Sequence, residues 1–220
     1  MGVVPADLLE FERPLLSSGQ VVVGIDEVGR GALAGPLVVG AVVLRDLNPP
    51  PEGLTDSKAL SAARRESLVG PLEEWADAWA LGWVEAAEID AWGIRLALSV
   101  AADRALCALT ITPTHALVDG SFNLLRAPRD VAFGVTPPVL SHEDLAVTTL
   151  VKGDARSATI AAASVLAKVA RDASMVERST AYPLYGWHEN KGYGSATHLA
   201  ALENHGACDE HRRSWNLPGL

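Results

Sequence analysis

The 220-residue chain has few cysteines and few lysines, and it has no long uninterrupted apolar stretch. Two cysteines, Cys107 and Cys208, are too few for a disulfide framework and favour a reducing environment. Glycine, proline or charged residues interrupt every apolar run well before the ~20 residues that a membrane-spanning helix needs. The N-terminal segment lacks the pattern of a secretion or lipidation signal. We therefore expect a cytoplasmic protein without a membrane anchor.

The overall charge argues against one class of nucleic-acid-binding protein. A formal net charge of −9 and a sequence pI near 5.1 argue against a protein whose whole surface coats nucleic acid. Only four of the 18 basic residues are lysines, and each lies in a segment that is distinctive for other reasons. They are candidates for binding substrate phosphates, with chance placement as the alternative. These lysines are Lys58, Lys152, Lys168 and Lys191.

Length and a hydrophobic content of 49% predict one main core. Val- and Leu-rich runs bounded by glycine predict strands, and apolar residues at helical spacing predict amphipathic helices. The expected strands cover residues 21–26, 37–44, 80–86, 115–119 and 145–154, and the expected helices lie within 61–79, 88–109, 157–177 and 198–204. This order predicts an α/β fold with a mixed central sheet flanked by helices, and a small helical region at the C-terminus.

Three aspartates share one property, since each follows a run of core-type residues and lies near a glycine. Because strand ends meet at a crevice in an open α/β sheet, we expect Asp26, Asp119 and Asp154 to converge. Carboxylate oxygens suit Mg²⁺ or Mn²⁺ better than zinc. Taken singly, Asp119 and Asp154 are better explained by an ordinary strand-to-turn boundary, which is an equal alternative for Asp26. The three together predict a metal site.

Glu27 directly follows Asp26, and neighbours on a regular strand point to opposite faces of the sheet. Both carboxylates face one metal if the strand bulges or turns here, for which Gly29 and Gly31 provide the freedom. The backbone carbonyl of Glu27 is a second route to the ion. A solvated turn is the alternative explanation of the acidic pair.

The segment VVVGIDEVGRGALAG is also close to the glycine-rich fingerprint of dinucleotide-binding proteins. That fingerprint requires a helix directly afterwards, because the helix N-terminus binds the pyrophosphate. Here Pro36 and the strand-like LVVGAVVL follow instead. The pattern therefore argues against a nicotinamide-dependent dehydrogenase.

Six segments, in a fixed order, resemble the ribonuclease HII family, or type 2 ribonuclease H. They are GIDEVGRGALAGPLVVGAVVL, TDSKALS, LVDG, VKGDARSATIAAASVLAKVARD, YPLYGWHENKGYGS and HRRSW, which together span about Val21 to Trp215. Any one fragment is weak evidence, but the ordered set is specific. Small departures from the family pattern are Ala59 after DSK, Ser195 after GYG, and Trp215 in place of a usual phenylalanine.

The resemblance implies a ribonuclease H-like fold with catalytic, metal-binding carboxylates at Asp26, Glu27, Asp119 and Asp154. It implies that Gly29, Arg30 and Gly31 read the ribose 2′-hydroxyl and hold the neighbouring phosphate. It also implies that Tyr193 stacks near the ribonucleotide at an RNA–DNA junction. Sensing a 2′-hydroxyl distinguishes RNA from DNA, and a glycine backbone can approach where a Cβ would intrude.

The resemblance further implies hydrolysis of the phosphodiester bond 5′ to ribonucleotides, in RNA–DNA hybrids and at single ribonucleotides embedded in duplex DNA. Two Mg²⁺ or Mn²⁺ ions are expected to activate the water and stabilise the leaving oxygen. Residues 1–180 are expected to form the catalytic domain of a monomer, and residues 181–220 a helical segment that contributes to nucleic-acid binding. A catalytically silent nucleic-acid-binding module is the alternative, but such a module needs none of the four carboxylates.

Other charged residues have two explanations at this stage. Lys168 and Arg171 either line the substrate path or form a solvated helix face. Residues 141–144, SHED, look ligand-like but are better explained as the capped start of a helix. The basic residues of the tail either contact nucleic acid or cap the last helix, and these are His205, His211, Arg212 and Arg213.

Overall fold

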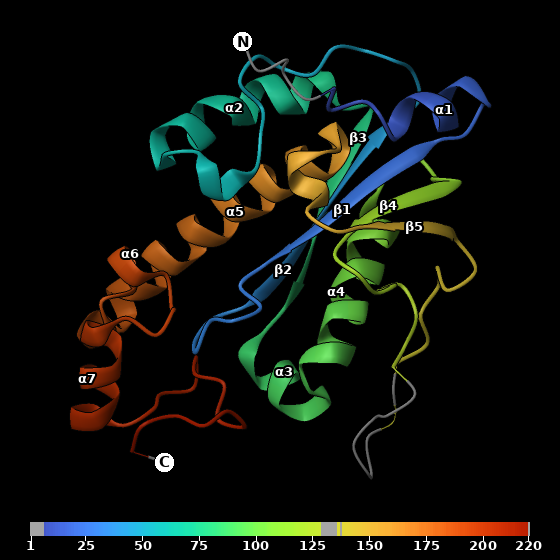
Figure 1. Cartoon of the computed structure of the whole chain (residues 1–220). Coiled ribbons are helices and arrows are strands. Elements are labelled where there is room, and N and C mark those ends of the chain that lie inside the picture. Colours follow the sequence, from blue (N-terminus) through green and yellow to red (C-terminus); the bar gives the residue numbers. More distant parts are fainter. Residues whose placement is uncertain (1–6, 129–135, 137, 220) are drawn as a thin grey trace.

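The computed structural model describes residues 7–128, 136 and 138–219. Within them, five strands form one mixed sheet in the order β3-β2-β1-β4-β5 (Figure 1). The strands are β1 (Val22–Val28), β2 (Leu37–Leu44), β3 (Ala78–Val84), β4 (His115–Asp119) and β5 (Ala146–Leu150). β1, β2 and β3 form an antiparallel meander, whereas β4 and β5 run parallel to β1. The predicted α/β fold with a mixed sheet is confirmed.

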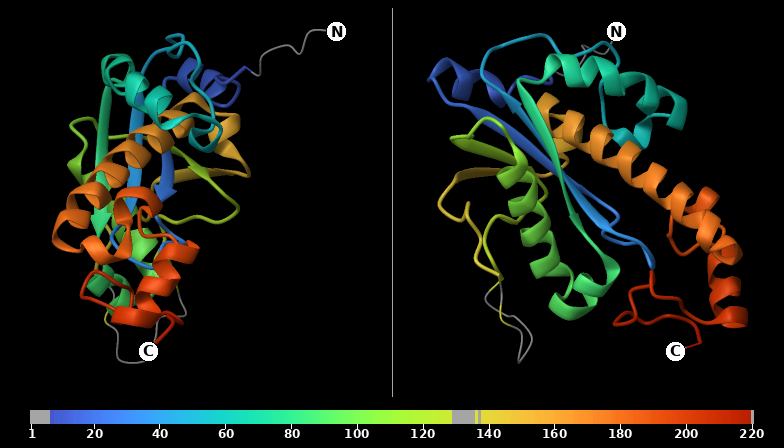
Figure 2. Two further views of the ribbon diagram at one scale, coloured as in Figure 1. Left: turned by 90° about the vertical axis from the view of Figure 1, so that its left-hand side faces the viewer. Right: turned by 180° about the vertical axis from the view of Figure 1, so that it is seen from behind.

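Helices cover both faces of this sheet, as the view from behind shows (Figure 2). α4 (Ile94–Ala108), preceded by α3 (Ala86–Trp92), packs on one face, and α2 (Ala62–Trp75) and α5 (Ala158–Ala181) cover the other. The shorter helices are α1 (Glu12–Ser17), α6 (Trp187–Asn190) and α7 (Ala196–His205). In the described part of the chain, no helix is both long and apolar enough to cross a membrane.

Two expected elements differ from the structure for local backbone reasons. The helix predicted over residues 88–109 is divided at Gly93, whose φ of +76° ends α3 and starts α4. The strand predicted over 145–154 ends at Leu150. Lys152 then takes a left-handed conformation with φ of +57°, and Gly153–Ala155 form a 3₁₀ turn. Asp154 is therefore positioned by a turn rather than by a strand.

The segment at residues 141–144 also differs from the prediction, because it does not begin a helix. It forms a turn that leads directly into β5. The capping explanation of SHED is therefore wrong, and the ligand-like side chains of this segment need another account.

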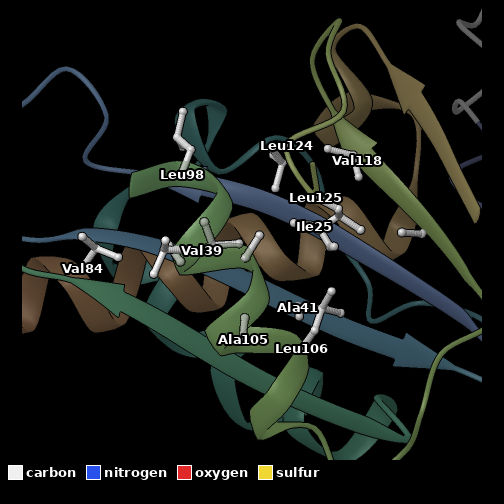
Figure 3. Packing of buried hydrophobic residues seen from close by; sticks show 14 of the residues in the cluster. Ile25, Val39, Ala41, Val84, Leu98, Ala105, Leu106, Val118, Leu124 and Leu125 are labelled. Carbon is white, nitrogen blue, oxygen red and sulfur yellow. The ribbon is translucent and has the colours of Figure 1, made fainter. Parts of the chain in front are cut away.

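The larger apolar core lies between the sheet and α4. Figure 3 shows Leu98, Ala105 and Leu106 of α4 facing Ile25 and Val39 of the sheet. A second core on the other face joins the sheet to α2 and α5. Because both faces are covered, the central strands are buried on both sides, which explains their continuous apolar sequence.

α5 approaches the sheet closely because glycine leaves room for the helix backbone. A Cβ on Gly40 would lie 2.5 Å from the carbonyl oxygen of Ala163. Gly40 pairs with Asp26 across β1 and β2. The close approach therefore brings Ser164, the next residue of α5, to the part of β1 that carries Asp26.

The C-terminal region has a small apolar core of its own, which includes Met175, Tyr185, Trp187 and Leu202. The segment between β1 and β2 belongs to the same core and is joined to the tail by a β-bridge between Ala34 and His211. The tail therefore packs against a loop that is far away in the sequence. The assignment of residues 181–220 to a separate segment stays a prediction.

Candidate active site

Asp26 and Asp119 come together through the parallel pairing of β1 and β4. Ile25 is opposite Val118 in this pairing, so Asp26 and Asp119 are the next residues along neighbouring strands. Ile25 and Val118 belong to the core under α4. Because side chains alternate along a strand, both aspartates face the opposite side of the sheet, which α5 covers.

Asp154 joins them from the turn after β5. Leu150 pairs with Asp119 at the end of β5, and the Gly153 N–H donates a hydrogen bond of 2.6 Å to Asp119 Oδ1. Asp154 follows directly and is buried. The three aspartates that the sequence places at strand ends therefore meet at one edge of the sheet.

Glu27 borders the same site without the bulge that the sequence suggests. β1 pairs regularly with β2 through Val28, with Glu27 opposite Val39, so Glu27 alternates away from the face of Asp26. The pairing of β1 with β4 ends at Ile25 and Val118, so the last residues of β1 have no paired strand beside them on the β4 side. The Glu27 carboxylate lies 3.6 Å from the Arg30 guanidinium and borders the groove that contains Asp26.

Burial and mutual repulsion dominate the electrostatics of this acidic cluster. Burial raises the pKa of Asp26 to about 8; a hydrogen bond with Ser164 opposes the rise, and the charges of Glu27, Asp119 and Asp154 add to it. Burial is also the main cause of the raised pKa values of Glu27 and Asp154. Arg30 beside Glu27 and Lys58 beside Asp154 offset only part of this effect, and a bound divalent cation would supply the remaining positive charge.

The donor set also fits a hard cation. A cavity of about 400 Å³ contains Asp26 and Glu27, and a second of about 480 Å³ contains Asp119 and Asp154. Among the described residues that border either cavity, none is a histidine or a cysteine. Oxygen donors alone suit Mg²⁺ or Mn²⁺ and not a soft metal ion.

Lys58 lies where the two cavities meet, because it borders both of them. Its ammonium group is 3.8 Å from Asp154 Oδ2, and its side chain is largely exposed. Burial lowers the pKa of Lys58, but the charges of Asp154, Asp26, Asp56 and Asp119 outweigh this and raise it. The lysine is therefore held in its charged form beside the acidic cluster.

The predicted substrate-reading residues border the same groove as Asp26, namely Gly29, Arg30, Gly31 and Tyr193. Gly29 has a φ of +85°, and a Cβ there would lie 2.1 Å from Arg171 Nε, so the position excludes a side chain. A Cβ on Gly31 would meet no other atom within 4 Å. Gly31 therefore offers its backbone to the open groove.

Arg212 holds this loop from behind, a role that sequence reasoning missed. Its guanidinium donates hydrogen bonds to the carbonyl oxygens of Gly29, Arg30 and Gly35, at 2.7, 2.8 and 3.1 Å. The side chain is completely buried. Arg212 therefore neither contacts nucleic acid nor caps α7, and both sequence-based explanations are wrong for it.

Arg171 supports the other side of the loop in the same manner. It is completely buried and donates to the carbonyl oxygens of Pro36, Ala34 and Lys191, at 2.8, 3.2 and 2.9 Å. Its guanidinium carbon also lies 5.3 Å from the ring centre of Tyr193, within the range of a cation–π contact. The expectation of a phosphate-binding or solvated Arg171 is therefore wrong.

Not all of the four candidate lysines lie at the cavities that contain the acidic residues. Lys168 borders the groove of Asp26 and pairs with Asp172, and the exposed Lys152 borders the cavity of Asp154. Lys191 does not border either cavity, because its ammonium group donates to the carbonyl oxygen of His188 on its own turn. Three of the four lysines thus lie near the acidic cluster.

Glu12 is a buried carboxylate that the sequence did not single out. Its Oε1 accepts hydrogen bonds from the Thr159 N–H at 2.9 Å and from the Ser157 hydroxyl at 2.6 Å. Ser157 in turn caps α5 by accepting from the Ile160 N–H. This network joins α1 to the start of α5, which lies only a few residues after Asp154. It therefore helps to position the turn that carries Asp154.

Solved structures with the same fold define the class of protein as ribonuclease H. The ribonuclease H2 from Pyrococcus horikoshii OT3 superposes with a TM-score of 0.68 at 27% identity, covering 89% of this chain and 94% of that one. The RNase HII in a PCNA:RNase HII complex from Archaeoglobus fulgidus gives 0.68 at 26% identity, covering 91% and 97%.

Sequence comparison gives the particular family. A family model described as ribonuclease HII matches residues 23–217. The ribonuclease HII of Jannaschia sp. (strain CCS1) is 48% identical over 94% of this chain and 93% of its own length. The chain belongs to the ribonuclease HII family, which is a family of endoribonucleases. The predicted enzyme class is thereby confirmed, and the dehydrogenase alternative is excluded.

Proposed function

We propose that this protein hydrolyses the phosphodiester bond 5′ to ribonucleotides, in RNA–DNA hybrids and at single ribonucleotides embedded in duplex DNA. One observation carries the proposal: the acidic residues Asp26 and Glu27 share a groove with the glycine loop at residues 29–31 and with Tyr193. Groups suited to phosphodiester hydrolysis and a backbone suited to ribose recognition are therefore adjacent.

Asp26, Glu27, Asp119 and Asp154 are the residues that would hold two Mg²⁺ or Mn²⁺ ions. When bound, divalent ions supply positive charge that polarises a phosphate and increases the acidity of water. The protein contributes a set of oxygen donors on two neighbouring strands and one turn. Bound cations would also favour the charged form of Asp26, against the burial and the neighbouring acidic charges that raise its pKa.

Recognition of the ribonucleotide is assigned to the loop between β1 and β2. Gly31 is exposed to the groove and leaves space for a close approach of the ribose 2′-hydroxyl to the backbone. Arg30 has an exposed side chain beside Glu27 and is available to a neighbouring phosphate. Arg171 and Arg212 hold the loop in this shape before substrate arrives.

Tyr193 provides a ring for stacking at the RNA–DNA junction. It borders the groove, and the buried Arg171 lies against its ring. Tyr193 comes from the C-terminal region, and its carbonyl oxygen accepts a hydrogen bond from His198 of α7. This is how we propose that residues 181–220 contribute to nucleic-acid binding.

Lys58, Lys152 and Lys168 are assigned to phosphates on either side of the scissile bond. Each borders one of the two cavities that contain the acidic residues. Contacts between lysines and phosphates release counterions from the nucleic acid, and this release favours binding less as the salt concentration rises. We therefore expect binding to weaken with salt. We propose that the protein acts as a monomer. We also propose that it lies in the cytoplasm, a reducing compartment that agrees with its two free cysteines.

The decisive assay is cleavage of a DNA duplex that contains one ribonucleotide, with Mg²⁺ or Mn²⁺ and with EDTA as the metal-free control. We expect cleavage on the 5′ side of the ribonucleotide and a 5′-phosphate on the product. Asp26→Asn and Asp154→Asn should abolish turnover without unfolding the protein, while the exposed Asp46→Asn serves as the matched control. Unchanged turnover in Asp26→Asn would refute the site, and binding without cleavage by the unmodified protein would favour the silent module.

A further inference from the structure

On the side of the sheet opposite the acidic groove, three side chains with different metal-binding atoms lie together. Asp103 and Cys107 are one turn apart on α4, and His142 lies in the segment that precedes β5. One ligand atom from each lies within 4.8 Å of the other two. His142 Nδ1 is 2.9 Å from Asp103 Oδ1, and Cys107 Sγ is 3.8 Å from Asp103 Oδ2.

The segment that carries His142 is held on α4 by its backbone. The Ser141 N–H donates a hydrogen bond of 2.8 Å to Asp103 Oδ1. Asp103 Oδ2 remains directed at Cys107, which is the only exposed member of the trio, since Asp103 and His142 are partly buried. The cluster is therefore preorganised on two elements and accessible from solvent at one side.

We propose that Asp103, Cys107 and His142 bind a divalent transition-metal ion of the Zn²⁺ class. A thiolate, an imidazole and a carboxylate together select a borderline-soft ion, in contrast to the all-oxygen donors around Asp26. The thiolate and the carboxylate carry two negative charges, which balance the charge of the ion. A water molecule completes the four ligands on the exposed side of Cys107.

The distances suit such an ion with a small adjustment. Zn–N and Zn–O bonds of ~2.0–2.1 Å and a Zn–S bond of ~2.3 Å place tetrahedral ligand atoms ~3.3–3.6 Å apart. The separation of 3.8 Å between Cys107 Sγ and Asp103 Oδ2 is slightly longer than this range. The His142–Asp103 pair, at 2.9 Å, opens by about half an ångström as a metal bond replaces the hydrogen bond.

The bound ion would fasten the start of β5 to α4. β5 is an edge strand of the sheet, and the turn after it carries Asp154. Without metal, the hydrogen bonds of Asp103 to Ser141 and His142 provide the connection. With metal, the ion would join His142 to both Asp103 and Cys107, and its binding free energy would stabilise this connection.

Cobalt binding to the whole protein tests the proposal. Co²⁺ bound to a thiolate has an intense charge-transfer absorption in the near ultraviolet, and Co²⁺ on oxygen ligands has none. We expect this band when Co²⁺ is added to the metal-free protein, and we expect it to disappear in Cys107→Ser. Cys208→Ser is the matched control, because Cys208 Sγ lies 3.2 Å from His211 Nδ1 and forms the other thiol–imidazole pair.

Competition with Zn²⁺ then measures the two remaining ligands. We expect His142→Gln and Asp103→Asn to weaken Zn²⁺ binding by at least the ~10–100-fold that loss of an outer-shell partner costs, because both residues are direct ligands. Nuclease activity with Mg²⁺ should be unchanged in Cys107→Ser, because Cys107 lies on the far side of the sheet. The absence of the band in the unmodified protein, its persistence in Cys107→Ser, or its loss in Cys208→Ser would overturn the proposal.

Discussion

Replacing Asp26 by asparagine should stabilise the metal-free protein while it abolishes cleavage. Asp26 is 5% exposed, and burial together with neighbouring acids raises its pKa from 3.8 to about 8. Asparagine has nearly the same shape, carries no charge, and keeps an oxygen that accepts the hydrogen bond from the Glu27 N–H. The substitution therefore removes an unfavourable charge at a small cost in packing.

The size and the pH dependence of the effect follow from the two pKa values. Between pH 3.8 and about 8, Asp26 binds more protons in the folded state than in the unfolded state, so the stability of the unmodified protein falls as the pH rises. The difference of about 4 pH units, at ~1.4 kcal/mol each, gives an upper limit of ~6 kcal/mol. The advantage of Asp26→Asn should thus be near zero at pH 4 and reach several kcal/mol above pH 8.

Urea unfolding at pH 5 and pH 8.5, in EDTA, measures this difference. Asp46→Asn, an exposed substitution with the same change of charge, is the control and should show little change at either pH. Mg²⁺ at 100 times its Kd should reduce this advantage of Asp26→Asn by ~2.7 kcal/mol, because the ligand stabilises only the protein that binds it. If Asp26→Asn is less stable than the unmodified protein at pH 8.5 without metal, the electrostatic account of the site is wrong.

Four further substitutions test the rest of the structure. Gly29→Ala should distort the loop and lower both stability and activity, because its Cβ would meet Arg171. The Cβ of Gly31→Ala would meet no protein atom within 4 Å, so we expect unchanged stability and an increased KM, which would show that the substrate closely approaches the backbone. Arg212→Met should cost at least ~1–3 kcal/mol in urea unfolding and raise KM, since buried carbonyl oxygens lose their donor. Unchanged stability would contradict that role. Burial lowers the pKa of His211 to about 4, so the folded protein loses stability as the pH falls from 6.5 to 4. His211→Gln should reduce this loss by at most ~3 kcal/mol in chemical unfolding. An unchanged dependence of stability on pH would exclude His211 as its cause.

The sequence predicts those parts of the site that depend on local pattern. The apolar runs indicate both strands and the end of β4 at Asp119, whereas β1 continues two residues beyond its predicted end at Asp26, to Val28. Alternation along the two paired strands then places Asp26 and Asp119 on a common face. The glycines of the loop after β1 indicate a backbone that side chains would obstruct, as Gly29 confirms. The ordered motifs indicate the family, which the comparisons confirm.

Other features depend on chain segments that are distant in the sequence. The left-handed Lys152 and the hydrogen bond from Gly153 to Asp119 place Asp154 in a turn, whereas an apolar run alone suggests a longer strand. Regular pairing of β1 with β2 directs Glu27 away from Asp26 without a bulge. Asp103 and His142 meet across 39 positions of sequence.

Arg212 shows most clearly what the sequence by itself determined and what tertiary structure decided. The sequence determined that a basic residue lies in the tail and that a glycine loop follows β1. The fold decided that this arginine is buried and binds the carbonyl oxygen of Gly29, which is 183 positions away. The presence of the strands and of the glycine loop follows from neighbouring residues, because it depends on the local apolar pattern and on local backbone preferences. Buried hydrogen bonds depend on which distant segments pack together, and only the folded chain specifies that packing.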